Sequence, residues 1–276
     1  MPVRFFYRHI AALKDALRQG PRYLVLACAL LAGSAWAQPT PAVALYYGSG
    51  IALSDFGNFD ILVVDPDHAT APRLPTTQVY AYASVTEVHP TRADYDQIPA
   101  QWKLARNADW QSDVIDQSIA QWPDFFADKV IAPLWQQGYR GFFLDTLDSY
   151  RLAQHFDEQA QQQGLVRVIN TLHQRFPGIQ LIFNRGFELI PQLPGKVQMV
   201  AAESLYRAWN ARTGRYEEVP QDDRAWLLGQ LRTIQERDHL PVLVIDYAPP
   251  QERELARRTA EKIAADGFIP WVTDSD

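Results

Sequence analysis

Two acidic residues, Asp145 and Glu203, each end an apolar run without helical spacing, residues 141–144 and 199–202. Such runs are typical of strands that are buried on both faces of a parallel sheet. In a barrel of parallel strands, the carboxyl ends meet at one face, where catalytic groups gather. Two carboxylates that face each other there are the groups that hydrolysis of a glycosidic bond requires.

We therefore predict that Asp145 and Glu203 form a catalytic pair. One ionised carboxylate would attack the anomeric carbon, and a protonated one would give its proton to the leaving oxygen. Repulsion between the two charges raises the pKa of one of them, which supplies an acid at neutral pH. We expect Arg185 to orient the pair and to keep one member ionised. The alternative is that one of these acids only forms an ordinary ion pair with Arg185.

Polar or aromatic residues also end the other apolar runs, which is costly unless they are partnered or face a wet cleft. We therefore expect a polar bowl at the carboxyl ends of the strands. The aromatic side chains of this bowl would stack on sugar rings, although for each of them packing in the core is the alternative. Asp65, Asp148 and Asp246 are rivals for the catalytic work, but sugar binding or support of neighbouring side chains suits them better. The predicted substrate-binding residues are Tyr47, Asp65, Tyr82, Asp148, Asn184, Arg185, Tyr206, Asp246, Tyr247 and Trp271.

Eight strand-like runs are present to position these residues. They span residues 43–48, 61–65, 78–85, 141–145, 180–184, 199–203, 242–247 and 269–273. Segments with helical spacing lie in four of the gaps, at residues 125–137, 157–176, 222–237 and 251–265. Alternating strands and helices predict an α/β fold, a (β/α)₈ TIM-like barrel. The two short first gaps predict abbreviated early crossovers, and the long gap at residues 86–139 predicts an inserted rim element between strands 3 and 4.

Residues 1–37 have the pattern of a secretory signal peptide. Five basic residues precede an apolar run at residues 23–33, and Ala35-Trp36-Ala37 provides small residues for cleavage. We predict a signal peptide at 1–37, a barrel domain at 38–276, and a periplasmic or secreted protein. An uncleaved anchor, or lipidation of Cys28, the only cysteine, are alternatives. Cleavage would leave a chain without cysteine, and thus without disulfides or thiol chemistry.

The charge and the missing motifs exclude several classes of function. The segment 1–37 carries a net charge of +4, so its removal would change the formal net charge from −6 to −10. Such a chain should repel nucleic acid and anionic lipid and would attract a cationic partner if the charge gathers in the groove. No nucleotide-binding or serine-hydrolase motif is present, so we predict no cofactor. Asp65, Asp67 and His68 leave a metal-dependent deacetylase as a minor alternative, since zinc would require further histidines at helical spacing.

Several short motifs resemble the endo-α-1,4-polygalactosaminidase-like glycoside hydrolase family, which includes the N-terminal hydrolase domain of periplasmic proteins that make Pel exopolysaccharide. The resemblance covers residues 42–274. The motifs are Tyr46-Tyr47-Gly48, Val64-Asp65-Pro66-Asp67-His68, residues 82–87, residues 141–150, Asn184-Arg185-Gly186, Glu203-Ser204 and Asp246-Tyr247.

This resemblance implies internal cleavage, with retention, of α-1,4-linked N-acetylgalactosamine or galactosamine polymers, during export or in release of biofilm matrix. It places Asp145 on the catalytic aspartate, the nucleophile, and Glu203 on the acid/base glutamate. A partly deacetylated polymer is cationic and would suit the acidic chain. Similar proteins continue into a deacetylase domain, whereas this sequence ends at Asp276, so we expect a stand-alone relative or part of a longer protein. Export machinery is a further expected partner, and a non-catalytic glycan-binding module is the alternative from another class.

Overall fold

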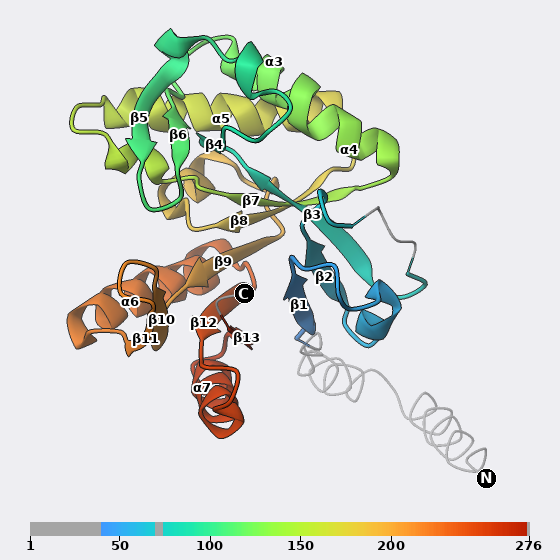
Figure 1. Cartoon of the computed structure of the whole chain (residues 1–276), viewed down its shortest axis with the longest axis vertical. Helices are drawn as coiled ribbons and strands as arrows, with labels where there is room; N and C mark the ends of the chain where they lie inside the picture. The colour runs from blue at the N-terminus through green and yellow to red at the C-terminus, as the bar shows by residue number, and fades with distance from the viewer. Residues whose placement is uncertain (1–39, 70–73, 275–276) are drawn as a thin grey trace, which may run out of the picture. The chain divides into compact units, whose positions relative to one another are not determined.

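The computed structural model describes residues 40–69 and 74–274, so the predicted signal peptide and Cys28 lie outside the described residues (Figure 1). Eight parallel strands form one sheet in the order β1-β2-β3-β7-β8-β9-β12-β13. Their bounds are Val43–Tyr46 (β1), Ile61–Val64 (β2), Gln78–Ser84 (β3), Gly141–Asp145 (β7), Gln180–Asn184 (β8), Met199–Glu203 (β9), Val242–Tyr247 (β12) and Ile269–Thr273 (β13). All eight predicted strands are confirmed, and the first three end one or two residues early.

The sheet curves into a nearly closed barrel. β13 contacts β1, although no backbone ladder joins these two strands in the described part of the chain. Alternate residues of each strand point inward, as the two-residue period of a strand requires. The inward side chains form a small apolar cluster that includes Val63, Phe143 and Ile182, while their neighbours join a larger cluster outside the strands. The predicted (β/α)₈ TIM-like barrel is confirmed.

Gly141 shows how tightly the lower barrel is filled. The Tyr80 ring lies against its backbone, and a Cβ atom on Gly141 would come within 2.6 Å of that ring. The Tyr80 hydroxyl then donates to Gln180 Oε1 on the next strand but one at 3.0 Å. The floor of the barrel is therefore closed by side chains, and only its carboxyl end is available for a ligand.

Four helical segments cover the barrel, as predicted. The first is continuous but consists of α3 (Trp122–Phe126), the π-helical η4 (Ala127–Ile131) and α4 (Ala132–Gln137), and it ends at Gly138 with φ +108°. The others are α5 (Glu158–Arg175), α6 (Gln221–Asp238) and α7 (Arg253–Ala265). The remaining crossovers are short, with 3-10 turns at η1 (Leu53–Phe56) and η6 (Phe187–Gln192). No helix in the described ranges is apolar and long enough to cross a bilayer.

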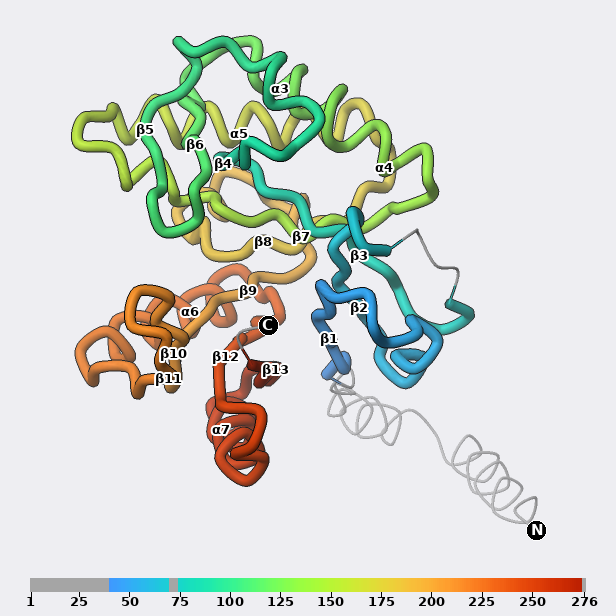
Figure 2. The backbone as a smooth tube through the Cα atoms, viewed as in Figure 1, coloured from blue at the N-terminus to red at the C-terminus, as the bar shows by residue number. Residues whose placement is uncertain are grey.

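Two additions stand at the carboxyl ends of the strands. The predicted rim element is a three-stranded antiparallel sheet, β4 (Glu87–Val88), β6 (Ser112–Ile115) and β5 (Lys103–Asn107), with the short turns η2 (Tyr95–Gln97) and η3 (Ala100–Trp102). The second is the hairpin of β10 (Arg207–Asn210) and β11 (Arg215–Glu218), which the sequence did not predict. The tube in Figure 2 shows the turn between β5 and β6 and the turn between β10 and β11 on the same side of the view, where β9 runs into β10.

Candidate active site

Three inward side chains end three adjacent strands, Asp145 on β7, Asn184 on β8 and Glu203 on β9. The amide of Asn184 connects the other two. Its Nδ2 donates to Asp145 Oδ1 and to Glu203 Oε1, both at 2.8 Å. The structure therefore brings together the two carboxylates that the sequence predicts as a pair, and one amide group orients both.

A tyrosine on each flank completes the hydrogen bonding of the pair. Tyr82 on β3 donates to Asp145 Oδ2 at 2.8 Å, and Tyr247 on β12 donates to Glu203 Oε2 at 2.6 Å. Each carboxylate thus has one tyrosine donor and shares the amide of Asn184. These neutral donors fix both carboxylates without neutralising either charge.

The surroundings of the pair favour the protonated form of Asp145 more than for an ordinary carboxyl group. Burial, followed by the negative charge of Glu203, raises the pKa of Asp145 to about 6. Hydrogen bonds from Tyr82, Asn184 and the Thr146 backbone act in the opposite direction. Neither carboxylate forms an ion pair with any described residue. Near pH 6 the carboxyl group of Asp145 can therefore exist in both its protonated and its ionised form.

Tyr47 and Asp65 lie beside the pair. Tyr47 is 40% exposed, and its ring meets that of Tyr82 edge-on at 5.3 Å. Burial of the hydroxyl group at the inner end of this side chain, followed by the charges of Asp145, Glu203 and Asp65, raises the pKa of Tyr47 well above its usual value. His68 Nδ1 contacts both the Tyr47 carbonyl oxygen at 2.8 Å and Asp65 Oδ2 at 3.2 Å. These contacts hold a neutral phenol and a third acid at the open side of the pair.

The backbone turns sharply after each of the three strand-end residues. Thr146, Arg185 and Ser204 have φ values of 64°, 61° and 65°, a left-handed conformation that is costly for residues with a Cβ atom. Strain of this kind is concentrated at functional sites. Thr146 is supported by Thr86, whose Oγ1 donates to the Thr146 carbonyl and whose backbone N–H donates to Thr146 Oγ1 at 3.0 Å. These turns could not be predicted from the sequence, because nothing in Thr, Arg or Ser signals a positive φ.

Asp246 lies away from the pair, because it points outward from β12 whereas its neighbour Tyr247 points inward. Its side chain is fully buried and accepts the backbone N–H groups of Leu205, Tyr206 and Arg207 at 2.7, 2.9 and 3.0 Å. Burial raises its pKa to about 6, although these donors favour the charged form. Asp246 therefore does not contact sugar directly, as one of its two predicted roles required. It instead holds the backbone that follows Glu203 in place.

Tyr206 also belongs to the outer layer rather than to the bowl. Its hydroxyl donates to Asp266 beyond α7, and its ring lies near the cationic groups of Arg224 and Lys262. Trp271 packs against Phe59 at a centroid distance of 6.1 Å and against the barrel core. For Trp271 these contacts match the core-packing alternative. For Tyr206 they replace the predicted contact with sugar by contacts in the outer layer.

Arg185 does not reach the two carboxylates as predicted. Its Nη2 donates at 3.4 Å to the backbone carbonyl of Glu203, so Asn184 performs the orienting task that was expected of Arg185. Arg185 and Asp148 line a cavity of about 330 Å³ between η6 and α6 that neither Asp145 nor Glu203 lines. Burial raises the pKa of Asp148, and Arg185 offsets part of that effect. Their contact with sugar stays a prediction.

The metal alternative gains no support from the geometry. No group of three or more His, Cys, Asp or Glu side chains in residues 40–69 and 74–274 is arranged to hold a metal ion. Asp65, Asp67 and His68 instead form a local turn, in which the Asp67 backbone N–H donates to Asp65 Oδ1 at 2.9 Å. The chemistry available at the carboxyl end of the barrel is that of paired carboxylates.

Comparison with known proteins agrees with this geometry. The model of glycoside-hydrolase family GH114 matches residues 28–276. The glycoside hydrolase domain of PelA from Pseudomonas aeruginosa is 36% identical, with a TM-score of 0.78 over 85% of this chain and 94% of that one. Ega3 from Aspergillus fumigatus, solved with galactosamine, shares the fold at 14% identity and a TM-score of 0.62, over 87% and 94% of the two chains. No curated protein sequence gives a significant match. A barrel with this pair of acids at its carboxyl end, matched by the family over nearly its whole length, is a glycosidase, and the chain belongs to glycoside-hydrolase family GH114.

Proposed function

We propose that the protein is an endo-acting glycosidase that cleaves α-1,4-linked galactosamine or N-acetylgalactosamine polysaccharide with retention. The observation that carries this proposal is the shared amide of Asn184. Because Nδ2 lies 2.8 Å from one oxygen of each acid, the two oxygens can be no more than about 5.6 Å apart. Carboxyl groups of retaining glycosidases lie about 5–5.5 Å apart, whereas those of inverting enzymes are separated by about 6.5–9.5 Å.

The proposed reaction has two steps. Asp145, ionised and held by Tyr82, attacks the anomeric carbon while Glu203 protonates the leaving glycosidic oxygen. Glu203, now ionised and held by Tyr247, then takes a proton from water, which displaces Asp145 from the sugar. The assignment of Asp145 as nucleophile follows the family resemblance. Because the pKa of Asp145 is raised in the empty site, this assignment requires the proton to lie on Glu203 once sugar is bound.

A cationic sugar suits the charge of this site. Asp145, Glu203 and Asp65 all act on the Tyr47 hydroxyl, and the first two have no cationic partner within the described residues. A protonated amine on galactosamine would reduce the repulsion among these acids. The likeness to the PelA hydrolase domain and to Ega3, whose structure holds galactosamine, supports the same class of substrate.

We further propose that the protein acts outside the cytoplasm, on exopolysaccharide. The support is the signal-peptide pattern of residues 1–37, which predicts a mature chain beginning at Gln38. N-terminal sequencing of the exported protein would test this. A mature protein that retains Met1, or that is found only in the cytoplasm, would contradict it.

Products from defined galactosamine oligomers test the activity. Internal cleavage should produce a range of oligomers in mass spectra, and proton NMR should show the α-anomer as the first product. Asp145→Asn and Glu203→Gln should abolish cleavage while the fold is retained. A stable complex without new reducing ends would show a binding module instead, and acetate release that a chelator blocks would show a deacetylase.

A further inference from the structure

Trp110 is an unusually exposed side chain for its size. It lies in the turn between β5 and β6 and is 68% exposed, more than any other large hydrophobic side chain in the described part of the chain. A single exposed ring needs no special explanation by itself. The way in which the turn holds Trp110, however, indicates a role for this ring.

The turn holds the backbone of Trp110 in place from both sides. Asn107 Oδ1 accepts the backbone N–H groups of Asp109 at 3.1 Å and of Trp110 at 3.4 Å. On the other side, Gln111 has a φ of 52°, and its carbonyl accepts Arg106 Nη2 at 3.1 Å. The tryptophan is therefore presented by a fixed turn.

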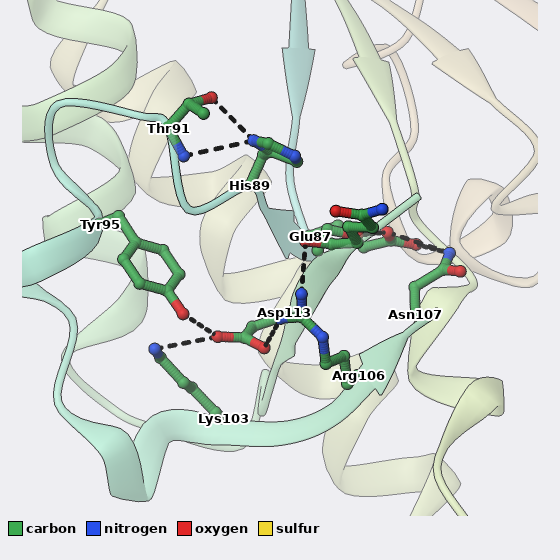
Figure 3. Close-up of polar contacts among 10 residues, drawn as sticks. Glu87, His89, Thr91, Tyr95, Lys103, Arg106, Asn107 and Asp113 are labelled. Carbon is green, nitrogen blue, oxygen red and sulfur yellow. Dashed lines mark hydrogen bonds and ion pairs between the residues drawn. The ribbon is translucent and has the colours of Figure 1, made fainter. Parts of the chain in front are cut away.

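Two buried carboxylates fix the strands below that turn (Figure 3). Glu87 on β4 accepts both Asn107, at 3.1 and 3.2 Å, and the hydroxyl of Ser112. Asp113 on β6 accepts Lys103 at 2.9 Å, Arg106 at 3.0 Å and the hydroxyl of Tyr95. Each of these two acids is only 8% exposed. Asn107 thus ties the turn to the buried base of the sheet.

This rigid hairpin is joined to the active site. The Ile115 backbone N–H donates to the Thr86 carbonyl at 2.7 Å, and Thr86 bonds to Thr146, the residue after Asp145. At about 3.3 Å per residue, the turn at Gln111 lies about 13 Å from Thr86. That distance corresponds to several sugar units along a polymer.

The Trp110 turn also meets the second hairpin, which follows Glu203. Asp109 Oδ2 lies 3.7 Å from Nε of Arg212, between β10 and β11. Such an exposed ion pair contributes little stability, but it shows that the two tips are neighbours. The β10–β11 hairpin follows β9, which carries Glu203, and the β5–β6 hairpin belongs to the insertion between β3 and β7. The two hairpin tips therefore meet at the carboxyl end of the barrel.

We infer that Trp110 forms a remote subsite, where its ring stacks on the apolar face of a sugar several units from the cleaved bond. This inference depends on the polysaccharide hydrolysis proposed above. The surroundings favour sugar over protein, since one ring beside Asp109 and Arg212 matches a single amphipathic sugar unit. A stable protein interface requires on the order of 1,000 Å². A ring on a fixed backbone binds with a smaller ordering cost than one on a mobile loop, which favours an aromatic subsite.

The test compares a long and a short substrate. The wild type, Trp110→Ala and the matched control Trp110→Phe would act on a partly deacetylated α-1,4-galactosamine polymer and on its tetramer. For Trp110→Ala, kcat/KM on the polymer should fall about three- to tenfold. A tetramer that is cut at its centre places only two sugar units on either side of the cleaved bond and so ends before the turn. Its hydrolysis should therefore remain unchanged. Trp110→Phe should retain at least about half of the polymer activity, because it keeps a ring.

The possible results separate this inference from the proposed function. If the wild type cleaves neither substrate, both proposals fail. If it cleaves both and Trp110→Ala matches it on the polymer, only the subsite is refuted. An equal loss on polymer and tetramer would also refute it, since the ring would then support the acid pair. Analytical ultracentrifugation of the wild type and Trp110→Ala tests whether Trp110 instead lies in a contact between two copies of the chain. If the variant loses self-association while its polymer cleavage is unchanged, the sugar-binding role is refuted.

Discussion

At the scale of single residues, the site depends on one amide that connects two acids. Replacing Asn184 with Ala removes donors from both Asp145 and Glu203 and leaves their positions less defined. We expect kcat to fall about 100-fold, since misplacement of catalytic groups by about 1 Å has effects of that size. The acidic limb of the pH–rate profile should move to higher pH, because the hydrogen bond from Asn184 that favours the ionised form of Asp145 is lost.

The matched control for Asn184→Ala is Gln180→Ala, at the other end of β8. Gln180 accepts the Tyr80 hydroxyl at the barrel floor and has no contact with the acids. This variant should lose stability without a shift in the pH–rate profile. An Asn184→Ala enzyme with wild-type kcat would show that the shared amide has no part in catalysis.

The ionisation of Asp145 should limit the stability of the wild-type protein. The pKa of Asp145 is raised to about 6 in the folded protein, against about 3.9 in an unfolded chain. The folded state therefore binds this proton more tightly, and the stability it contributes is present below pH 4 and is lost as the pH rises through 6. Asp145→Asn, which cannot ionise, should be more stable than the wild type at pH 8 by about 3 kcal/mol.

Urea unfolding at pH 4 and at pH 8 measures this difference. The gain should shrink at pH 4, where the wild-type carboxyl group is neutral in the folded protein and only about half ionised in the unfolded chain. A variant that is less stable than the wild type at pH 8 would contradict the proposed burial of an unfavourable charge.

Strand alternation explains which site residues the sequence could predict. Asp145 and Glu203 share the inward face with Phe143 and Ala201, two positions earlier on their strands. Asp246 is adjacent to the inward Tyr247, so the same alternation places it outside the barrel, and the residue type alone suggested a sugar contact. The direction of the Arg185 side chain could not be read from the sequence, because it depends on a turn with positive φ.

At the scale of elements, the turns after β7, β8 and β9 hold the three strand-end side chains at the mouth. Ser204 has φ 65°, and its backbone N–H donates to the Ile245 carbonyl at 2.8 Å. Glycine adopts this conformation without steric cost, so Ser204→Gly should stabilise the fold by about 0.5–1 kcal/mol. The freer turn should position Glu203 less firmly, and kcat should fall several-fold.

Ser204→Ala provides the comparison for Ser204→Gly. It also removes the hydroxyl but keeps the Cβ atom and hence the strain, so neither stability nor kcat should change much. Thermal unfolding and steady-state kinetics of both variants separate the two effects. Equal behaviour of the Gly and Ala proteins would show that the turn stores no functional strain.

Elements that pack on the core could be predicted. At the rim, the place of the insertion at residues 86–139 could be predicted, but its strands and the β10–β11 hairpin could not. The eight strands and four helical segments have apolar periodicity, because each buries one or both faces. The β10–β11 hairpin consists of Arg207–Asn210 and Arg215–Glu218, which are polar and half-buried or exposed. The β4 strand has only two residues. Such elements are fixed by local bonds such as those of Glu87, which leave no periodic pattern.

At the scale of the whole molecule, the formal net charge of −6, which would become −10 without residues 1–37, acts on any charged substrate. A cationic polymer should be attracted to this protein at long range, and salt should weaken that attraction. We therefore expect KM for a partly deacetylated galactosamine polymer to rise several-fold between about 50 and 300 mM NaCl, because the screening length falls over this range. The fully acetylated polymer is neutral, so its KM should stay nearly constant and serves as the control. The same salt response for both polymers would mean that the charge of the chain has no role in substrate capture, and that recognition depends on the contacts at the acid pair and its hairpins alone.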